Sequence, residues 1–496
     1  MKKIISLIAI VMLLQSCYKD EGNYDYRDIN EITISGIPST YETSDGTATI
    51  IPVFASTMPL NENDLTFEWL SLTSGQVFAT TRNLENTPLG LSGSYHIVRY
   101  RVTDQSSGKM FDKEFTLYIR TTYTTGYLVM NDVDGMMRLD MLSWLNNVYT
   151  HYPEVGFGLP PQTGPKKIVN FSDPVMSSSI GGRAIYLLTQ TGTNRIHPVT
   201  LSWEPNYNIR YAFLSPDMCP PDFVADNISS LSNVALLSGQ GNFYLYAHTS
   251  NILWSDPINT IDLGVNYYTP SPIYAGYGQY YLVFDSVAKS FYNITVNAAR
   301  TTKINTALAT LTPYENTEKD IVYMGANYAF PGFTTNIFFY SILKDANSDY
   351  WLLRSHTGAS QPVHTQDIWI KMNATDINRA TAFAVGGEFF NNLYYAVDGK
   401  VYEYNIADNQ SYLMLDKENE KITYLGFVLN TRHGTDFLDA YKCIVVASYN
   451  ETAKVGTLEH YTIPPLQQPF VLYEDPVRGA THSWSGFGKI VDVCNK

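Results

Sequence analysis

A hairpin of strand-forming residues recurs along most of this chain and restricts its fold more than any other feature. Its clearest copy is residues 393–415, where runs rich in Tyr, Val and Ile flank Asp398-Gly399. Asp and Gly tolerate the positive φ angles of a two-residue turn, so the pattern predicts an antiparallel hairpin. Comparable hairpins begin near Leu128, Ile185, Ala235, Leu282, Phe338, Tyr394 and Ile444.

The spacing between these hairpins indicates how they assemble. Successive hairpins start about 50 residues apart, which is roughly the period of a four-stranded propeller blade. Sheets that repeat radially protect their edges. We therefore expect residues 123–496 to form a seven-bladed β-propeller. The longer segments between hairpins, such as residues 152–170, 215–233 and 258–279, are expected to be loops on the two faces of the propeller.

The composition favours an all-β protein with more than one domain. A chain of 496 residues exceeds what one ordinary core holds. Its 38 Tyr, 23 Phe and 7 Trp residues favour strands over helices. The formal net charge of −14 argues against a nucleic-acid partner, because such a partner requires clustered Lys and Arg.

The first residues have the pattern of an exported, lipid-modified protein. Lys2 and Lys3 precede the apolar residues 4–14, a stretch too short to span a bilayer but suited to a signal peptide over residues 1–16. The sequence Leu-Gln-Ser-Cys that ends at Cys17 resembles the bacterial lipobox. We expect acyl chains on Cys17 to anchor the protein to a membrane. A secretory leader followed by a chance Cys is the alternative.

The residues after Cys17 indicate which membrane surface the protein occupies. Tyr18-Lys19-Asp20-Glu21 resembles the export signal that sends lipoproteins of Bacteroidota through the outer membrane to face outward. Residues 17–29 would then be the lipidated Cys with its spacer. The expected location is the outer membrane, with a lipid anchor and the protein on the extracellular side.

Residues 30–122 have a different pattern, typical of a β-sandwich. Short strand candidates alternate with Pro, Gly, Asn and Asp clusters. Trp69 is placed like the core tryptophan of such a domain, and Val98, Tyr100 and Val102 would share one buried face, with Arg99 and Arg101 facing solvent. The strand candidates are residues 32–37, 48–54, 65–70, 95–102 and 114–119.

The last two of these strands resemble the closing hairpin of polycystic-kidney-disease (PKD) domains. Together with the lipobox and the Asp/Asn/Tyr-rich spacer, this hairpin resembles the PKD-like family of Bacteroidota lipoproteins. The resemblance implies a function beside a TonB-dependent transporter and its SusD-like lid lipoprotein, in the capture or processing of nutrients at the cell surface.

One loop of the expected propeller is unusually rich in Tyr, Pro and Gly. Its tyrosines Tyr267, Tyr268, Tyr274 and Tyr277 are candidate ligand contacts, because aromatic rings on stiff loops suit stacking on sugar faces or packing against peptide side chains. The alternative is that these rings fill the gaps between adjacent blades.

Three cysteines follow Cys17. Cys443 opens the seventh hairpin and Cys494 closes the chain, so the two could form a disulfide if the last strand completes the ring beside that hairpin. Inert thiols in the core are the alternative, and we expect Cys219 to be one.

The sequence contains no recognisable metal, cofactor or catalytic motif. Asp345, Asn347 and Asp349 have the spacing that opens a calcium loop, but Tyr350 replaces the required Gly, so we expect a hairpin turn. Our first hypothesis is therefore a non-enzymatic protein that binds a peptide or glycan, or docks onto the transporter. The alternatives are a hydrolase or lyase acting on surface glycans or peptides, which needs only two carboxylates close in space, and a purely structural surface protein.

Overall fold

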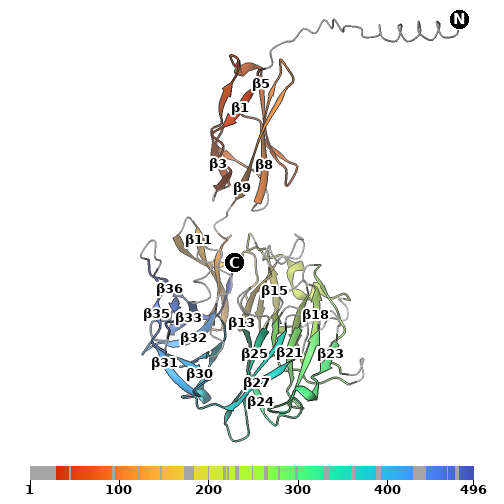
Figure 1. Ribbon diagram of the computed structural model, residues 1–496, viewed down its shortest axis with the longest axis vertical. Helices are drawn as coiled ribbons and strands as arrows, with labels where there is room; N and C mark the ends of the chain where they lie inside the picture. The colour runs from red at the N-terminus through yellow and green to blue at the C-terminus, as the bar shows by residue number, and fades with distance from the viewer. Residues whose placement is uncertain are drawn as a thin grey trace, which may run out of the picture. The chain divides into compact units, whose positions relative to one another are not determined.

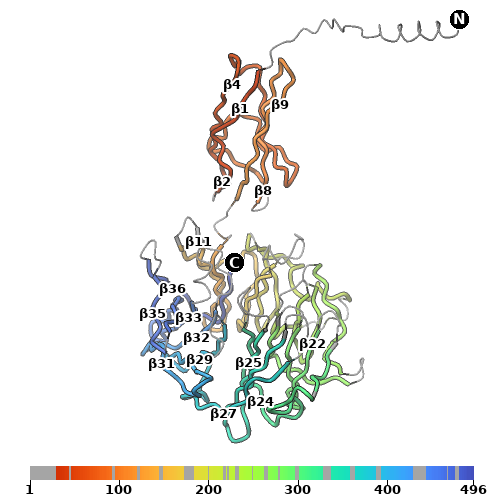
Figure 2. The backbone as a smooth tube through the Cα atoms, viewed as in Figure 1, coloured from red at the N-terminus to blue at the C-terminus, as the bar shows by residue number. Residues whose placement is uncertain are grey.

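The structure is a computed structural model and divides into two compact units, between Ile119 and Arg120 (Figure 2). It describes residues 30–496 except for 44–45, 92–94, 120–122, 124, 146–147, 172–183, 199, 216–218, 220–222, 230–233, 248–249, 262–265, 278–279, 296–299, 328–335, 359–363, 387–391, 428–442, 466 and 475–479. Regular structure in these residues is β-strand or short 3-10 helix, and none of their helices is long and apolar enough to cross a membrane. Cys17 lies outside the described residues.

Unit 1 packs a five-stranded sheet, in the order β2-β9-β8-β5-β6, with the two-stranded sheets β1-β4 and β3-β7. Strand β2 is parallel to β9. One hydrophobic cluster unites these sheets, and Trp69 and Tyr100 at its centre are fully buried. The strands are β1 (Ile32–Ser35), β2 (Thr40–Thr43), β3 (Thr47–Ile50), β4 (Val53–Ser56), β5 (Leu65–Ser71), β6 (Val77–Ala79), β7 (Leu84–Pro88), β8 (Tyr95–Asp104) and β9 (Met110–Ile119).

The predicted alternation along β8 is confirmed. Val98, Tyr100 and Val102 are buried. Arg99 donates to Glu114 at 2.7 Å and Arg101 donates to Asp112 at 2.9 Å on the outer face. These ion pairs lie across the β8–β9 hairpin, where opposite charges on facing strands stabilise the pairing.

One strand prediction in unit 1 was wrong. Residues 48–54 form parts of two strands rather than one, because Pro52 separates β3 from β4. Proline has no backbone N–H for a sheet ladder, so the chain leaves one sheet and enters another there. Strand β3 pairs with β7, whereas β4 pairs with β1.

Unit 2 contains seven antiparallel sheets in its described residues, numbered here in chain order (Figure 1). Sheet 1 comprises β12 (Val148–Val155), β11 (Met136–Leu145), β10 (Gly126–Val133) and β37 (Lys489–Asn495); sheet 2, β13 (Pro165–Asn170), β14 (Ile185–Thr189) and β15 (Thr193–Ile196); sheet 3, β16 (Ala225–Ser229), β17 (Ala235–Gly239), β18 (Asn242–Ala247) and β19 (Ile252–Leu253); sheet 4, β20 (Ala275–Tyr277), β21 (Tyr280–Asp285), β22 (Ser290–Thr295) and β23 (Arg300–Lys303).

The remaining sheets have the same plan. Sheet 5 comprises β24 (Asp320–Asn327), β25 (Asn336–Lys344), β26 (Tyr350–Gly358) and β27 (Thr365–Lys371); sheet 6, β28 (Ala382–Ala384), β29 (Asn392–Val397), β30 (Lys400–Asn405) and β31 (Gln410–Asp416); sheet 7, β32 (Lys421–Phe427), β33 (Cys443–Asn450), β34 (Val455–Thr462) and β35 (Val471–Leu472), with β36 (Ser483–Phe487) also on β34.

Each predicted hairpin is a pair of neighbouring strands in one sheet, and in the sheets of four or more strands it is the central pair. The pairs are β10–β11, β14–β15, β17–β18, β21–β22, β25–β26, β29–β30 and β33–β34. Asp134 and Gly135 at the first turn have φ angles of 51° and 86°, as a type I′ turn requires. Asp398 at the clearest predicted turn has a positive φ, of 49°, but Gly399 does not, so that hairpin forms without a type I′ turn.

The first strand of each hairpin is largely apolar because both of its faces are buried. Side chains alternate between the two faces of a strand, and on β14 Ile185 and Leu187 pack toward sheet 1 while Tyr186 and Leu188 pack toward sheet 3. Seven hydrophobic clusters join the sheets in this way: 1 with 2, 2 with 3, 3 with 4, 4 with 5, 5 with 6, 6 with 7, and 7 with 1. The order of these contacts returns to sheet 1.

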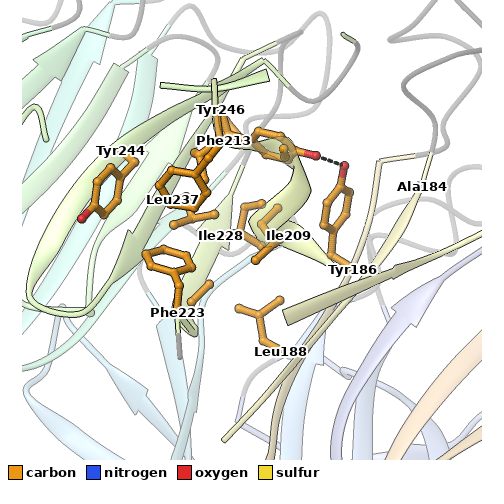
Figure 3. Packing of buried hydrophobic residues seen from close by; sticks show 14 of the residues in the cluster. Ala184, Tyr186, Leu188, Ile209, Phe213, Phe223, Ile228, Leu237, Tyr244 and Tyr246 are labelled. Atoms are coloured by element: carbon orange, nitrogen blue, oxygen red, sulfur yellow. Dashed lines mark hydrogen bonds between the residues drawn. The ribbon is translucent and has the colours of Figure 1, made fainter. Parts of the chain in front are cut away.

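The cluster between sheets 2 and 3 illustrates the packing (Figure 3). Tyr186 and Tyr246 approach from the two sheets, and their hydroxyl groups are hydrogen-bonded at 2.9 Å. Phe213 and Phe223 pack edge to face at 5.0 Å. Buried tyrosine hydroxyls need such partners.

The segments predicted to be loops contain the first strands of the sheets, and this prediction was wrong. Strand β13 lies within residues 152–170, β16 within 215–233 and β20 within 258–279. These strands are short and interrupted by polar residues, so they lack the continuous apolar pattern of the central strands.

The last strand joins the first sheet. Strand β37 pairs with β10, and Gly126 and Lys496 exchange backbone hydrogen bonds of 3.1 and 2.9 Å. The blue end of the chain therefore lies beside the gold strands at the beginning of unit 2 (Figure 1).

Candidate functional site

The first strands of neighbouring sheets lie side by side at their free edges. In sheet 1 this position, next to the predicted hairpin, is taken by β37, which we therefore count among the first strands. Strand β37 contacts both β13 and β32, and β13 also contacts β16. Edge strands have backbone groups that no ladder satisfies, and these need other partners. Polar side chains from the first strands supply several of them. We call the following set the first-strand network: Lys167, Asn170, Asn227, Tyr424 and Asp492.

Asp492 connects sheet 1 to sheet 2. Its carboxylate accepts hydrogen bonds from the backbone N–H of Ile168 at 2.9 Å and of Val493 at 3.0 Å. Burial raises the pKa of this carboxyl group to about 6, although the two N–H donors and the charge of Lys167 act to lower it. Asp492 therefore changes its charge close to neutral pH.

Lys167 extends the connection from sheet 2 to sheet 3. Its Nζ donates to Oδ1 of Asn227 at 2.6 Å and to the carbonyl oxygen of Ile228 at 3.4 Å. Asn227 in turn donates to the carbonyl oxygen of Pro272 at 3.1 Å. Burial lowers the pKa of Lys167, and the charge of Asp492 opposes that shift.

Two further side chains bind the backbone of β37. Asn170 donates to the carbonyl oxygen of Asn495 at 2.7 Å, and the Tyr424 hydroxyl donates to that of Val493 at 3.4 Å. Burial raises the pKa of Tyr424 well above its ordinary value. Burial also lowers the pKa of the Lys496 side chain to about 7.

Tyr424 belongs to a short pattern that β24 and β32 share. In both β24 and β32 a tyrosine precedes a glycine by two positions, as Tyr323–Gly325 and Tyr424–Gly426. A Cβ atom at either glycine would approach the hydroxyl of that tyrosine to 2.3 or 2.5 Å. The glycines therefore leave room for the tyrosine rings, and Tyr323 stacks on Phe383 of the next sheet at 5.2 Å.

The network combines a carboxyl group that titrates near neutrality with a cation and several hydrogen-bond donors. Lys167 and Asp492 both keep partial exposure to solvent. Such an arrangement can hold or release a proton, and its opposite charges can orient a polar ligand. Its hydrogen bonds also join first strands whose backbone edge groups would otherwise lack partners.

The tyrosines predicted to contact a ligand have different environments. Tyr268 and Tyr274 are buried in the cluster between sheets 3 and 4, where they bond to Thr301 Oγ1 at 3.1 Å and to the carbonyl oxygen of Leu236 at 2.8 Å. They fill the gap between sheets, as the alternative interpretation stated. Tyr267 is 55% exposed. The side chain of Tyr277 lies outside the described part of the structure.

The candidate disulfide is absent, since Cys443 and Cys494 are both thiols in the structure. Cys494 packs beside the cluster between sheets 1 and 2, whereas Cys443 is the first residue of β33 in sheet 7. The last strand belongs to sheet 1 and does lie beside sheet 7, as the disulfide would require, but the two cysteine side chains lie at different clusters. Cys219 is a buried thiol, as expected.

The predicted turn at Asp345 is confirmed. Its carboxylate accepts from the N–H groups of Asn347 and Asp349 and from the indole of Trp351, all within 3.0 Å. These donors occupy the oxygens that a cation would need. In the described residues no group of three or more His, Cys, Asp or Glu side chains is placed to hold a metal ion.

Sequence reasoning missed every member of the first-strand network. One signal was present: Asp492 is a lone acid in the apolar run Ile490-Val491-Asp492-Val493. A charged residue inside an apolar strand must be paired or must shift its pKa. Its partner on sheet 2 could not be inferred, because Ile168 lies 324 positions earlier in the chain.

Structural comparison places the chain beside several solved proteins at low similarity. A quinonprotein alcohol dehydrogenase-like protein from Bacteroides thetaiotaomicron is 13% identical, covering 94% of this chain and 96% of that one, with a TM-score of 0.39. AztD from Citrobacter koseri is 12% identical, covering 79% and 96%, with a TM-score of 0.36. Similarity at this level does not bear on activity.

Comparison of sequences is informative for the beginning of the chain only. No curated protein matches it. Residues 17–154 match the PKD-like family, a range that starts at Cys17, covers unit 1 from there to Ile119 and continues into sheet 1 of unit 2.

Proposed function

We propose that this chain is an outer-membrane surface lipoprotein that serves as a ligand-binding or docking accessory of a TonB-dependent transporter and its SusD-like partner. The observation that carries the proposal is the PKD-like match, because it starts at Cys17, the residue that the lipobox marks for lipidation. Acyl chains on Cys17 would hold unit 1 and unit 2 at the membrane surface. The ligand is a peptide or an oligosaccharide.

We further propose that the seven sheets of unit 2 close into a seven-bladed propeller. Two observations support closure: the interface clusters return from sheet 7 to sheet 1, and β37 completes sheet 1 from the far end of the chain. In such a ring the first strands surround the central axis. Lys167 and Asp492 would then be charged groups in the centre, where a polar ligand could reach them.

Replacement of Cys17 tests the location. In cells fed labelled palmitate, the Cys17→Ser variant should lose the label and move from the membrane fraction to the soluble fraction. The Cys219→Ser variant, which removes a buried thiol, should keep the label and stay in the membrane fraction. Labelled Cys17→Ser protein would contradict the proposed anchor.

Affinity purification of the detergent-solubilised protein tests the partnership. We expect a TonB-dependent transporter and a SusD-like lipoprotein to be recovered with it, and to be lost at high salt if charged surfaces hold the complex. Recovery of the lipidated protein alone would contradict the accessory role.

A hydrolase or lyase is the second candidate, and the raised pKa of Asp492 favours it. A carboxyl group that titrates near pH 6 can act as a general acid or base. In this case the Asp492→Asn variant would lose turnover of a glycan or peptide while its affinity for that substrate remained. Equal turnover by both proteins would exclude Asp492 from this role.

A further inference from the structure

A second group of side chains, separate from the first-strand network, gathers where sheet 1 meets sheet 7. Trp144 and Tyr149 face each other across the β11–β12 pair. Trp484 lies on β36, opposite Leu458 of β34. Tyr473 directly follows β35 and His482 directly precedes β36, and the N–H of His482 donates to the carbonyl oxygen of Tyr473 at 2.9 Å. We call these five residues the aromatic platform.

The rings of the platform form one continuous set. Centroid distances are 4.5 Å from Trp144 to Tyr149, 4.6 Å from Tyr149 to Trp484, 5.1 Å from Trp484 to His482 and 4.7 Å from His482 to Tyr473. Each ring is therefore held by a neighbour that belongs to another strand or segment. Aromatic side chains fixed in this way lose little conformational entropy when they bind.

All five side chains of the platform are partly exposed, and they rest on a buried floor. Tyr127 and His460 beneath them are 1% and 5% exposed and lie 5.0 Å apart. Nδ1 of His460 lies 3.2 Å from Nδ1 of His482. The floor is polar and aromatic, so the platform presents flat rings together with N–H and O–H groups at their edges.

We propose that the aromatic platform binds the sugar rings of a neutral oligosaccharide. A pyranose ring has an apolar C–H face that packs on an indole or phenol ring, and hydroxyl groups at its edge that need polar partners. The five platform residues include no aliphatic side chain, which a peptide-binding pocket would normally provide. The net charge of −14 disfavours acidic glycans. The assignment rests on the proposed ligand-binding role and specifies its substrate class.

Calorimetric titration of the full-length, detergent-solubilised protein tests the assignment. The probes are cellohexaose, xylohexaose and mannohexaose, with oligogalacturonate as the acidic arm and a tryptic peptide mixture as the peptide arm. We expect at least one neutral hexaose to bind, with a change in tryptophan fluorescence. The Trp484→Ala variant should weaken binding at least tenfold, and Trp484→Phe, which keeps a ring, should weaken it less.

Trp369→Ala is the matched control. Trp369 is also partly exposed and stacks on another tryptophan, Trp351, at 5.0 Å, but it lies in sheet 5. This variant should bind the hexaose as the wild type does. Trp144→Ala, at the end of the platform, provides a second test if Trp484→Ala does not fold.

The outcomes separate the two proposals. If no neutral hexaose binds, if the peptide or acidic arm binds instead, or if Trp369→Ala weakens binding as much as Trp484→Ala, the platform assignment is overturned. The transporter association is measured independently by affinity purification. If the transporter is recovered with the protein but no hexaose binds, the proposed function stands and the platform assignment fails.

Discussion

Asp492 is the residue whose replacement tests the first-strand network most directly. Burial raises the pKa of its carboxyl group to about 6, so between about pH 4 and that value the folded state binds more protons than the unfolded state. Its contribution to stability therefore falls as the pH rises through this window, by at most about 3 kcal/mol. The free energy of unfolding of Asp492→Asn, measured with urea, should therefore rise relative to that of the wild type by up to this amount between pH 4 and pH 7.

Asp226→Asn is the control for this pH dependence. Asp226 lies on a neighbouring first strand, where it pairs with Lys166 at 2.9 Å and keeps 39% side-chain exposure. Its variant should show no comparable gain across the same pH range. A parallel gain in both variants, or none in Asp492→Asn, would refute the raised pKa of Asp492.

The environment of Asp140 predicts that its contribution to stability depends on pH with the opposite sign. Its side chain is fully buried in sheet 1 and accepts hydrogen bonds from Arg138 at 2.7 Å and from His151 at 3.0 Å. Burial alone would raise its pKa, but these bonds outweigh burial and lower the pKa. The stabilisation is present above the ordinary pKa and disappears as the pH falls through the lowered one. Asp140→Asn should cost about 3 kcal/mol at pH 7 and progressively less in acid.

The exposed pair Lys289–Asp320 provides the comparison for Asp140. Asp320 has a 71% exposed side chain, and an ion pair in water is worth less than about 1 kcal/mol. Asp320→Asn should therefore change the urea midpoint only slightly. An Asp140→Asn variant no less stable than Asp320→Asn would show that the buried carboxylate does not stabilise sheet 1.

At the scale of elements, the sequence predicts the central hairpins well because burial on both faces leaves a local signature. Ile185 to Leu188 on β14 are apolar without interruption and are followed by a short turn. The first strands carry no such signature: β13 reads Pro-Lys-Lys-Ile-Val-Asn, and its lysines bind groups on sheet 3. Long-range pairing decides that β13 is a strand, so a local pattern could not reveal it or the polar network that it carries.

Strand β37 allows a matched test of closure between the two ends of unit 2. Ile490 is fully buried in the cluster between sheets 7 and 1, whereas its neighbour Val491 sits at a register shift and is partly exposed. Ile490→Ala should cost about 2 to 4 kcal/mol through the cavity it leaves. Val491→Ala should cost clearly less in the same urea experiment. Equal losses of unfolding free energy in the two variants would mean that the packing of Ile490 does not stabilise this interface.

For the whole molecule, the two units place different demands on the sequence. Unit 1 has one core, and the alternation along β8 was sufficient to predict its buried face. Unit 2 distributes its core over seven interfaces, each of which needs residues from two sheets. The period of the hairpins predicts how many sheets there are, but the partner of the last strand depends on how the ends meet. The last strand was expected beside the seventh hairpin, and it does contact β32, β33 and β34 of sheet 7, but its ladder partner is β10 of sheet 1.

Closure into a ring predicts that unit 2 unfolds as one cooperative unit. In a linear array of sheets each member contacts only its neighbours, and distant members can unfold separately. In a ring every sheet has two interfaces, so the loss of any sheet opens two of them. Leu188→Ala in sheet 2 and Leu352→Ala in sheet 5 each truncate a fully buried side chain. Each variant should lower the temperature of the same calorimetric transition, because each loses about 2 to 4 kcal/mol of unfolding free energy. Val98→Ala in unit 1 should lower a different one. Hydrogen exchange would identify the sheets involved, and a transition that splits, with sheet 2 opening while sheet 5 remains protected, would show that the ring is open.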